Sequence, residues 1–547
     1  MQSDLSYASA PKLKHYVYKT HMEMIHHWAH LFPDKEAFVE YDENGKRDFI
    51  TCQQLLIKSR SFGWYVTGLG IKKGDTVAIC MKNSLNMLVS LFGVQFAGGI
   101  PISIIQSRAD GSDVINTVRD NKSKLLIMDM KEGDQSWALP DNIQLSSGIA
   151  SLSNIIYNKK AEMITYSFKE NTTNIMDFVT IPEVQLPDIF PEDLAIYFTT
   201  SGSTGKPKLV GHSHFGLFNS TFLINDCLGI DSQSRFFCDR PFGWGVGSPR
   251  TFLASGATRV FVDMALSLHQ NNIDILSNII HKERCTHVYL PGYLLADLTN
   301  SSGNETNFTT VQAIKFAGER FSKQYAKLLG RFCKKLVIWY GSTEAAGVSA
   351  FSSPNAHDYA EGIIGKPLPG IEMKLVDEQG HVVAIGEIGE VHARSVYRFI
   401  EYKNMHDKFL DTVDEANWIC TGDLAYMRTD GNLVMIGRKN DYISVGSVKI
   451  FPQDLEEILN TCPEIDAVIV VPVPDKRLYQ AICVCAILSA TVSIDTSDLN
   501  KLFDHLWADK SHLKPRYYLA FKEFPKNSSG KIDRKEIARE ASLKLNL

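Results

Sequence analysis

The feature that most constrains the fold is a short apolar segment, Leu194–Phe198, that runs directly into a loop of hydroxyls, glycines and lysines. The apolar segment has the length and composition of a buried strand. Glycines let the loop turn tightly and bring its backbone N–H groups close to an anion, and lysines add positive charge. We therefore expect the loop to bind a polyphosphate. The residues predicted to bind it are Thr200, Ser201, Gly202, Ser203, Thr204, Gly205, Lys206 and Lys208.

This loop differs from the common P-loop, in which a glycine is followed by four residues and then by Gly-Lys-Ser/Thr. Thr200 stands where the first glycine would be. Pro207 follows Lys206, where a magnesium-binding hydroxyl would be. The pattern therefore disfavours an ordinary nucleotide kinase or ATPase.

Expected strands and helices alternate between residues 50 and 130, which is typical of a parallel sheet with helices on its faces. Such a sheet places its ligand at the carboxyl ends of its strands, where the phosphate loop also lies. Residues before about 45 are expected to be a helix followed by a loop, and residues 131–190 an irregular surface segment. The expected helices are Leu55–Leu69, Leu85–Phe96, Phe215–Cys227 and Ile273–Lys282. The expected strands are Thr76–Met81, Ile100–Ile105, Leu125–Met128, Thr258–Val262, Thr286–Leu290, Val311–Phe316 and Lys335–Trp339.

A chain of 547 residues is too long for one core, and its composition changes near residue 437. The fold class predicted is α/β. A large N-terminal domain (1–436) has mostly parallel sheets flanked by helices, and a hinge (437–441) leads to a small, mobile α+β domain (442–547). The elements expected in the small domain are a helix from Pro452, strands Ala467–Val473 and Gln480–Leu488, and a helix from Ser497.

The charge and cysteine patterns exclude several classes of protein. The net charge of −5 gives no footprint for nucleic acid. The ten cysteines are scattered without a CxxC pair, which disfavours zinc and a disulfide scaffold. No apolar run reaches transmembrane length, and no signal-peptide core is visible. The C-terminal tripeptide is not the peroxisomal Ser-Lys-Leu. We expect a cytoplasmic protein, with the mitochondrial matrix as the open alternative.

Several further motifs accompany the loop. Thr200–Lys208 matches the pattern [ST]-[ST]-G-[ST]-T-G-x-P-K, and Tyr340–Glu344 matches Y-G-x-T-E. Asp423 follows Thr421-Gly422, and Pro525–Lys531 matches P-[KR]-[TN]-x-[ST]-G-K. In these motifs the chain resembles the adenylate-forming superfamily of acyl-CoA synthetases, luciferases and peptide-synthetase adenylation domains. The resemblance extends from about residue 30 to 540 and is nearest to the AMP-forming acyl-CoA ligases.

The resemblance implies roles for individual residues. Lys531 would be the catalytic lysine, Thr343 would bond the α-phosphate, and Glu344 would hold Mg²⁺. Asn440 would be the hinge residue, at a position where the family usually has Asp or Lys. The remaining residues implied to bind ATP or AMP, on the adenine and ribose sides, are Gly318, Glu319, Tyr340, Gly341, Asp423 and Arg438.

Three residues are expected in the acyl pocket: Trp244, Gly341 and Gly347. Acetate-specific relatives carry a bulky tryptophan at the position of Gly341, so a glycine there suggests a deeper pocket. We therefore expect a medium-chain fatty acid or an aryl acid as the substrate.

The activity expected from the resemblance is ATP-dependent formation of an acyl-AMP with release of pyrophosphate, followed by transfer of the acyl group to CoA. ATP and CoA are co-substrates and Mg²⁺ is the cofactor. The expected partners are these small molecules, with no nucleic acid, no integral membrane segment and no fused carrier domain. Two alternatives remain open: luciferase-like oxygenation of the adenylate, and a non-catalytic nucleotide-binding protein.

Overall fold

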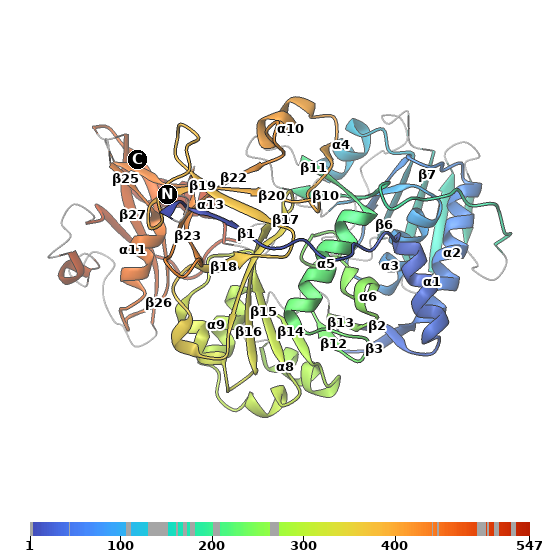
Figure 1. Ribbon diagram of the computed structural model, residues 1–547, viewed down its shortest axis with the longest axis horizontal. Helices are drawn as coiled ribbons and strands as arrows, with labels where there is room; N and C mark the ends of the chain where they lie inside the picture. Colours follow the sequence, from blue (N-terminus) through green and yellow to red (C-terminus); the bar gives the residue numbers. More distant parts are fainter. Residues whose placement is uncertain are drawn as a thin grey trace.

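The computed structural model shows a large mixed α/β domain followed by a smaller C-terminal domain, drawn in orange and red at the left of Figure 1. The residues that the structure describes are 4–42, 44–104, 111–129, 151, 153–159, 162–167, 172–175, 181–200, 208–262, 273–439, 441–445, 448–477, 479–489, 499, 503–507, 514–526 and 532–547.

The largest sheet has fourteen described strands. Its central strands, from β16 across to β2, run parallel, and the strands on either side pair antiparallel. In spatial order the strands are β1 (Tyr7–Ser9), β19 (Glu372–Val376), β20 (Ile388–Arg394), β22 (Ile419–Met427), β23 (Leu433–Arg438), β18 (Ile363–Pro367), β17 (Ala346–Ser353), β16 (Lys335–Ser342), β15 (Ala313–Ala317), β14 (His287–Tyr289), β12 (Arg235–Phe237), β13 (Thr258–Val262), β2 (Glu36–Tyr41) and β3 (Arg47–Thr51).

A second sheet has nine described strands and carries the predicted phosphate loop between β10 and β11. Strands β10, β5, β4, β6 and β7 are parallel to one another, as the alternating pattern predicts. In order the strands are β21 (Glu401–Tyr402), β11 (Lys208–Ser213), β10 (Leu194–Thr200), β5 (Ile100–Ser103), β4 (Thr76–Cys80), β6 (Leu125–Asp129), β7 (Asn154–Lys159), β8 (Glu162–Ser167) and β9 (Thr172–Ile175).

The helices cover the sheets, and several begin at the side-chain caps that their sequences supply. Thr20 and Thr51 each accept a hydrogen bond from the backbone three residues on, in complete capping boxes. The helices are α1 (His21–Leu31), α2 (Cys52–Gly68), α3 (Leu85–Phe96), α4 (Ser112–Asp120), α5 (His214–Leu228), α6 (Arg250–Ser255), α8 (Ile273–Lys282), α9 (Gly292–Asn300), α10 (His406–Thr412), α11 (Pro452–Leu459) and α13 (Arg534–Lys544). Short 3₁₀ turns are η2 (Glu305–Phe308), η3 (Lys323–Leu328), η4 (Ala356–Asp358) and η6 (Asp504–Trp507).

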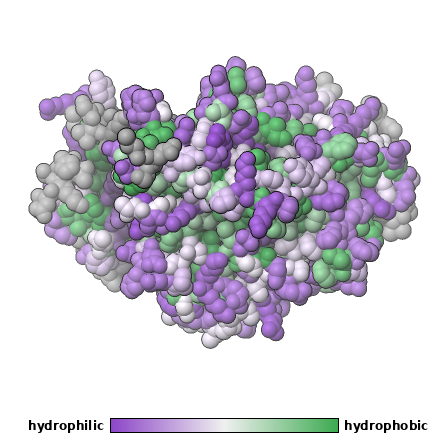
Figure 2. All heavy atoms as spheres, in the orientation of Figure 1, coloured by the Kyte–Doolittle hydropathy of each residue, from purple (hydrophilic) through white to green (hydrophobic). Residues whose placement is uncertain are grey.

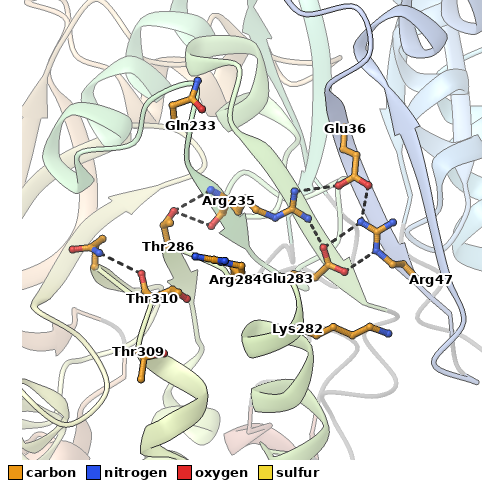
Figure 3. Close-up of a pocket in the computed structure, with 11 residues that line it drawn as sticks. Glu36, Arg47, Gln233, Arg235, Lys282, Glu283, Arg284, Thr286, Thr309 and Thr310 are labelled. Carbon is orange, nitrogen blue, oxygen red and sulfur yellow. Dashed lines mark hydrogen bonds and ion pairs between the residues drawn. The ribbon is translucent and has the colours of Figure 1, made fainter.

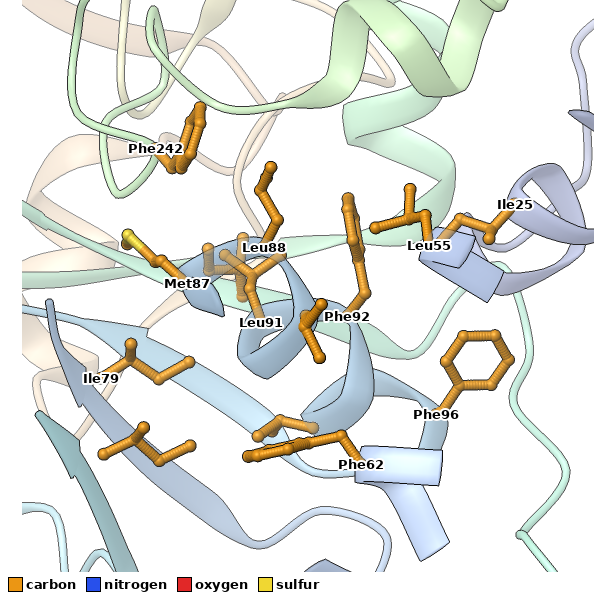
Figure 4. Packing of buried hydrophobic residues seen from close by; sticks show 14 of the residues in the cluster. Ile25, Leu55, Phe62, Ile79, Met87, Leu88, Leu91, Phe92, Phe96 and Phe242 are labelled. Carbon is orange, nitrogen blue, oxygen red and sulfur yellow. The ribbon is translucent and has the colours of Figure 1, made fainter. Parts of the chain in front are cut away.

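The core of the nine-stranded sheet depends on close packing of α2 against α3 (Figure 4). A Cβ on Gly93 would lie 2.6 Å from the ring of Phe62, and a Cβ on Gly63 would lie 2.8 Å from Phe96 Cβ. Glycine at both positions lets the two helices approach, so their buried side chains interdigitate. The packed helices hold the sheet that carries β10 and the phosphate loop.

The small domain is built on a five-stranded sheet whose longest pair is β26 and β27. Helix α11 begins at Pro452, as predicted, and α11 and α13 pack on β26. The predicted helix from Ser497 falls mostly outside the described residues. The strands are β24 (Ile443–Val445), β25 (Val448–Ile450), β26 (Ile465–Asp475), β27 (Tyr479–Leu488) and β28 (Tyr517–Ala520).

The structure confirms the helices and strands expected between residues 50 and 130, and also the later strands of the large domain. Two expectations were wrong. The loop expected before residue 45 contains β2, which pairs with β3 across a turn at Gly45. The segment expected to be irregular contains β7, β8 and β9 at the edge of the sheet. In both places short strands lie between polar stretches, so the polar composition hid their alternation.

Hydrophilic residues cover most of the face seen in Figure 2, with small hydrophobic areas between them. Within the described ranges, the helices lack the combined length and apolar character that crossing a bilayer requires.

Candidate nucleotide and acyl site

The two described ends of the predicted phosphate loop are held side by side. Thr200 ends β10 and Lys208 begins β11, and the two residues pair across the antiparallel strands. Thr199 donates a 3.0 Å hydrogen bond from its hydroxyl to the carbonyl of Ser103 on β5. Ser201, Gly202, Ser203, Thr204, Gly205 and Lys206 lie outside the described residues.

The Tyr340–Glu344 motif forms the end of β16 and the tight turn into β17. Thr343 and Glu344 lie in that turn, and neighbouring strands fix it. His212 of β11 contacts the carbonyl of Thr343 through Nε2 at 2.7 Å. The backbone N–H of Phe399 donates to the carbonyl of Glu344 at 2.8 Å. The turn therefore lies against the strand that starts at the phosphate loop.

Tyr402 connects the phosphate loop to Glu344. Its hydroxyl donates a 2.7 Å hydrogen bond to Oε1 of Glu344, and its ring lies 5.3 Å from Nζ of Lys208. Tyr402 is buried and sits on β21, paired with β11. Burial and the nearby Glu344 carboxylate raise the pKa of Tyr402, so this hydroxyl stays a donor. Two predicted binding residues from distant parts of the chain therefore meet at one ring.

The Glu344 carboxylate offers an oxygen ligand for a divalent cation. Tyr402 fixes Oε1, and no hydrogen bond to Oε2 is recorded from any described residue. Mg²⁺ in proteins takes one or two carboxylate oxygens together with phosphates and water. Glu344 beside the base of the phosphate loop fits that requirement.

A second cluster joins Tyr340, Asp423 and Arg438. The Tyr340 hydroxyl donates to Oδ2 of Asp423 at 2.8 Å, and Nε of Arg438 lies 3.0 Å from Oδ1. Asp423 and Arg438 are direct partners on β22 and β23. Burial raises the pKa of Asp423, while the Arg438 cation and the Tyr340 hydroxyl act to lower it. Asp423 is 6% exposed, and the side chain of Arg438 is 60% exposed, so the cluster extends from the core to the surface.

Gly318 and Glu319 follow β15, and Tyr340 and Gly341 lie at the end of the parallel strand β16. Ala317 pairs with Trp339, so the two strand ends are adjacent. The structure thus brings the predicted adenine-side residues together at the carboxyl edge of the large sheet, where such folds bind ligands.

The two glycines assigned to the acyl pocket pair with each other across β16 and β17. A Cβ on Gly341 would lie 2.0 Å from the carbonyl oxygen of Ala346. A Cβ on Gly347 would lie 2.0 Å from the ring of Trp339. Both glycines are therefore required by close packing, independently of the acid that binds. Pocket depth at Gly341 stays a prediction.

Trp244 lies in the turn that follows Pro241 and is partly buried. Its carbonyl accepts hydrogen bonds from the backbone N–H groups of Gly247, at 3.1 Å, and Ser248, at 2.7 Å. The turn packs closely, since a Cβ on Gly247 would lie 2.1 Å from the carbonyl oxygen of Pro241.

Lys531 and Asn440 lie outside the described residues, but the residues that flank Lys531 are placed. Lys526 and Ile532 form an antiparallel bridge. Nζ of Lys526 lies 5.1 Å from the ring of Tyr293 on α9 of the large domain. A second contact between the domains joins Arg320 and Glu457 at 3.7 Å. The predicted lysine loop is therefore flanked by a residue that contacts the large domain.

A separate cavity of about 670 Å³ lies at the other end of the parallel strands from the predicted site (Figure 3). Arg235 begins β12 and Thr286 precedes β14, whereas the predicted site lies beyond the carboxyl ends of β15 and β16. Arg47 bonds Glu36 and Glu283 at 2.7 Å each, and Arg235 pairs with the same two acids. These charges satisfy one another and tie β2, β3 and β12 together.

Sequence reasoning missed Tyr402 and His212. Neither belongs to a motif that points to nucleotide chemistry. Tyr402 lies on a two-residue strand, and only the pairing of that strand with β11 brings the ring to Glu344. The one available signal was the position of His212 four residues after Lys208, on the strand that leaves the phosphate loop.

A large α/β domain with this loop at a strand end, followed by a small α+β domain, defines the class as an adenylate-forming enzyme. Two family models match the chain: AMP-binding enzyme over residues 25–402, and AMP-binding enzyme C-terminal domain over residues 454–531. The chain belongs to the AMP-binding enzyme family.

Relatives and solved structures match along almost the whole chain. A mitochondrial medium-chain acyl-CoA ligase of Mus musculus is 24% identical and covers 99% of this chain and 91% of its own length. The crystal structure of an anthranilate CoA ligase with anthranoyl-AMP has a TM-score of 0.80 at 21% identity, covering 97% of this chain and 98% of that chain. An o-succinylbenzoate CoA synthetase from Bacillus subtilis, solved with ATP and magnesium, has a TM-score of 0.75 at 20% identity, covering 95% and 99%. The activity class is therefore that of an AMP-forming ligase.

Proposed function

We propose that the chain uses ATP to convert a carboxylic acid to an acyl-AMP, releasing pyrophosphate, and then transfers the acyl group to the thiol of CoA. The observation that carries the proposal is the meeting of Lys208 and Glu344 at the Tyr402 ring, next to the Tyr340–Asp423–Arg438 cluster. A phosphate-binding loop, a metal-binding carboxylate and a ribose-binding acid are the three parts that an adenylating site needs.

The chemistry explains why positive charge must gather there. A carboxylate is a poor electrophile, and a bond to AMP gives it a good leaving group. The carboxylate oxygen attacks the α-phosphorus of ATP, the bond to the bridging oxygen breaks, and pyrophosphate leaves with that electron pair. Both reactants are anions, so preorganised cations lower the barrier most. When bound at Glu344, Mg²⁺ supplies charge neutralisation on the phosphates.

The side chains divide the remaining work. The loop from Thr200 to Lys208 holds the departing pyrophosphate, and Thr343 bonds the α-phosphate. Tyr340 packs against adenine, Gly318 and Glu319 border the same pocket, and Asp423 with Arg438 holds the ribose. Lys531 of the small domain neutralises the attacking carboxylate and the α-phosphate.

Because Lys531 and these groups belong to different domains, adenylation requires the domains to close at the hinge near Asn440. The contact of Lys526 with Tyr293 supports this assignment, since it holds one flank of the lysine loop against the large domain. Rotation about the hinge would then remove Lys531 and admit CoA.

We assign the acid to the medium-chain fatty or aryl classes. The named activities of the mouse ligase and of the anthranilate ligase fall into these two classes. Trp244, Gly341 and Gly347 are the residues proposed to border the acyl group.

The test is acid-dependent exchange of labelled pyrophosphate into ATP, measured over straight-chain acids of graded length and over aryl acids. Thioester formation is then measured with CoA. We expect exchange with at least one of these acids, and thioester once CoA is added. Absence of exchange with every acid would overturn the proposal. Exchange without thioester would overturn the CoA step alone.

The Lys531→Ala variant tests the catalytic lysine. Loss of one preorganised charge is expected to reduce adenylation by about a hundredfold or more, or ~3 kcal/mol. Preformed acyl-AMP should still react with CoA. Lys535→Ala, at an exposed lysine of α13, is the matched control and should exchange normally. Unchanged exchange in Lys531→Ala would contradict the assignment.

A further inference from the structure

Three cations lie near one another in the large domain: Arg250, Arg259 and Lys315. We call them the buried cation cluster, although Arg250 is only partly buried. Lys315 is 4% exposed and Arg259 is 1% exposed. Arg250 begins α6, Arg259 lies on β13 and Lys315 on β15. The fields of both arginines reach Lys315 and act to lower its pKa.

Among the residues that the structure describes, no acid is hydrogen-bonded or ion-paired to a member of this cluster. Burial lowers the pKa of Arg259, although the charge of Asp239 acts through space to raise it. Arg250 bonds the Gly245 carbonyl at 2.5 Å, and Arg259 bonds the carbonyls of Cys238 and Gly247. Nζ of Lys315 lies 5.4 Å from the Trp339 ring and 6.0 Å from the Tyr289 ring. The nearby acid Asp239 is bonded through its carboxylate to Arg240, which is not a member of the cluster.

Two buried nitrogens near the cluster also have no hydrogen-bond partner within the described ranges. They are Nη1 of Arg259 and Nδ1 of His212, and both are inaccessible to solvent. His212 is near enough to Arg250 for that cation to lower its pKa. Nε2 of His212 donates to the Thr343 carbonyl, so its Nδ1 is an acceptor, whereas Nη1 of Arg259 is a donor. Buried polar groups in folded proteins nearly always have a partner, so Nη1 of Arg259 indicates a missing acceptor.

The cluster lies between the two segments assigned to the acyl pocket. Arg250 and Arg259 hold the carbonyls of Gly245 and Gly247, in the turn that follows Trp244. Lys315 contacts the Trp339 ring, which occupies the space beside Gly347. An acyl group bordered by Trp244 and Gly347, as proposed above, would therefore approach the cations.

We propose that the acid activated by this enzyme carries a second carboxylate, which binds the buried cation cluster while the first carboxylate receives AMP. This inference rests on the proposed function and specifies its substrate class. The second carboxylate supplies the negative charge that the cluster lacks, and its oxygens accept hydrogen bonds from Lys315 and Arg250. The acid is then a dicarboxylic acid, aliphatic or aryl.

Lys315 is the residue that discriminates between substrates. Its strand runs parallel to β16, and Lys315 lies on the same face as Trp339, the neighbour of Tyr340. Burial lowers the pKa of Lys315 to about 8, so the free enzyme loses this charge as the pH rises above that value. The titratable or charged groups around it are Arg250, Arg259, Cys238, Cys227 and Tyr289.

The test compares acids of equal length with one or two carboxylates: octanedioic with octanoic acid, and benzene-1,4-dicarboxylic with benzoic acid. The measured quantity is the ratio of kcat/KM for the dicarboxylic acid to kcat/KM for the monocarboxylic acid, in pyrophosphate exchange. We expect a ratio above ten for at least one pair. Lys315→Met keeps the apolar stem and should lower that ratio about tenfold or more, because a hydrogen bond to a charged group is lost. Lys334→Met, at an exposed lysine just before β16, should leave the ratio unchanged.

The outcomes separate this inference from the proposed function. Exchange with none of the acids overturns the proposed function. Exchange in which the monocarboxylic acid is preferred in both pairs overturns only the inference, as does a preference for the dicarboxylic acid that Lys315→Met leaves intact. Should Lys315→Met fail to fold, the pH profile of the wild-type ratio decides. A fall above pH 8 supports the role of Lys315, and a flat profile refutes it.

Discussion

The nucleotide side and the acyl side of the proposed site treat charge in opposite ways. On the nucleotide side each acid has a partner: Asp423 has Tyr340 and Arg438, and Glu344 has Tyr402. On the acyl side the cations Arg250, Arg259 and Lys315 contact backbone carbonyls or rings, and no described acid is bonded to any of them. On the nucleotide side the carboxylates Asp423 and Glu344 are bonded to neighbouring side chains, whereas on the acyl side no acid is bonded to the cations among the described residues.

The free energies involved show how unfavourable the arrangement on the acyl side is without a ligand. An ion taken out of water without a partner costs several kcal/mol, whereas a cation–π contact returns about 0.5–2 kcal/mol. The rings beside Lys315 therefore offset only part of its burial. Selection for stability alone would replace such a lysine with an apolar residue, so its presence on the acyl side indicates a requirement of binding.

The largest effect is expected on the nucleotide side, at Glu344. Glu344→Gln keeps the shape of the side chain and removes the charge proposed to hold Mg²⁺. We expect kcat/KM for ATP to fall by about a hundredfold, or ~3 kcal/mol, because one preorganised charge is lost from the transition state. Pyrophosphate exchange at several Mg²⁺ concentrations measures it. Glu372→Gln, which removes the charge of an acid on β19 that Tyr7 and Arg394 contact, is the control. Equal activities of the two variants would refute the role of Glu344.

The contrast also separates what sequence could predict from what it could not. The residues proposed for the nucleotide side could be named from the sequence because each part is a contiguous motif near the end of a strand, as with Tyr340–Glu344 at the end of β16. The acyl side was not, because its groups come singly from different elements. Lys315 lies within the sequence AIKFA, and nothing there shows that the lysine is buried by strands on both sides of β15.

Fold prediction failed for a related reason. Strands β7, β8 and β9 pair only with their neighbours at one sheet edge, so their alternation is weak beside the polar residues around them. The parallel interior strands with apolar runs were predicted correctly, namely β4, β5, β6, β10, β13, β14, β15 and β16. Residues whose role is fixed by pairing across the fold, such as Tyr402 opposite Val210, need the structure.

The second effect concerns the stability of the fold and two buried histidines near Arg250, namely His21 and His212. Burial, with a smaller contribution from the Arg250 cation, lowers the pKa of His21 and of His212 from 6.5 to about 4. Below pH 6.5 these histidines bind protons in the unfolded chain but stay neutral in the folded protein. The free energy of unfolding therefore falls as the pH drops towards 4. Each histidine can contribute on the order of 2–3 kcal/mol to that loss.

Urea unfolding at pH 7 and pH 5 measures this loss, with His21→Gln as the variant. Removing the buried imidazole should make the unfolding midpoint less dependent on pH. His381→Gln is the control, because that side chain is 82% exposed. The same pH dependence in His21→Gln as in the wild type would show that the acid sensitivity arises elsewhere.

The boundary between the two sides should be sensitive to a single methyl group. Gly347→Ala places a Cβ 2.0 Å from the Trp339 ring, which contacts Lys315. Overpacking of this kind costs about 1–3 kcal/mol in unfolding free energy. Gly68→Ala, where nothing lies within 4 Å, is the control and should be close to neutral. If both variants unfold at the same urea concentration, Trp339 is not packed as tightly as described.

The smallest effect concerns Tyr402, which contacts both Lys208 at the end of the phosphate loop and Glu344 of the Tyr340–Glu344 motif. Tyr402→Phe keeps the ring beside Lys208 and removes the 2.7 Å hydrogen bond to Glu344. A freer carboxylate should bind Mg²⁺ less well, so we expect the Mg²⁺ concentration for half-maximal exchange to rise about tenfold, ~1.4 kcal/mol, with little change at saturating Mg²⁺. Tyr7→Phe removes a hydrogen bond of the same length to Glu372, outside the site, and serves as the matched control. A fall in activity that saturating Mg²⁺ does not restore would mean that Tyr402 acts on ATP itself. The nucleotide side would then include an aromatic residue that contacts ATP directly, in addition to its acids and their partners.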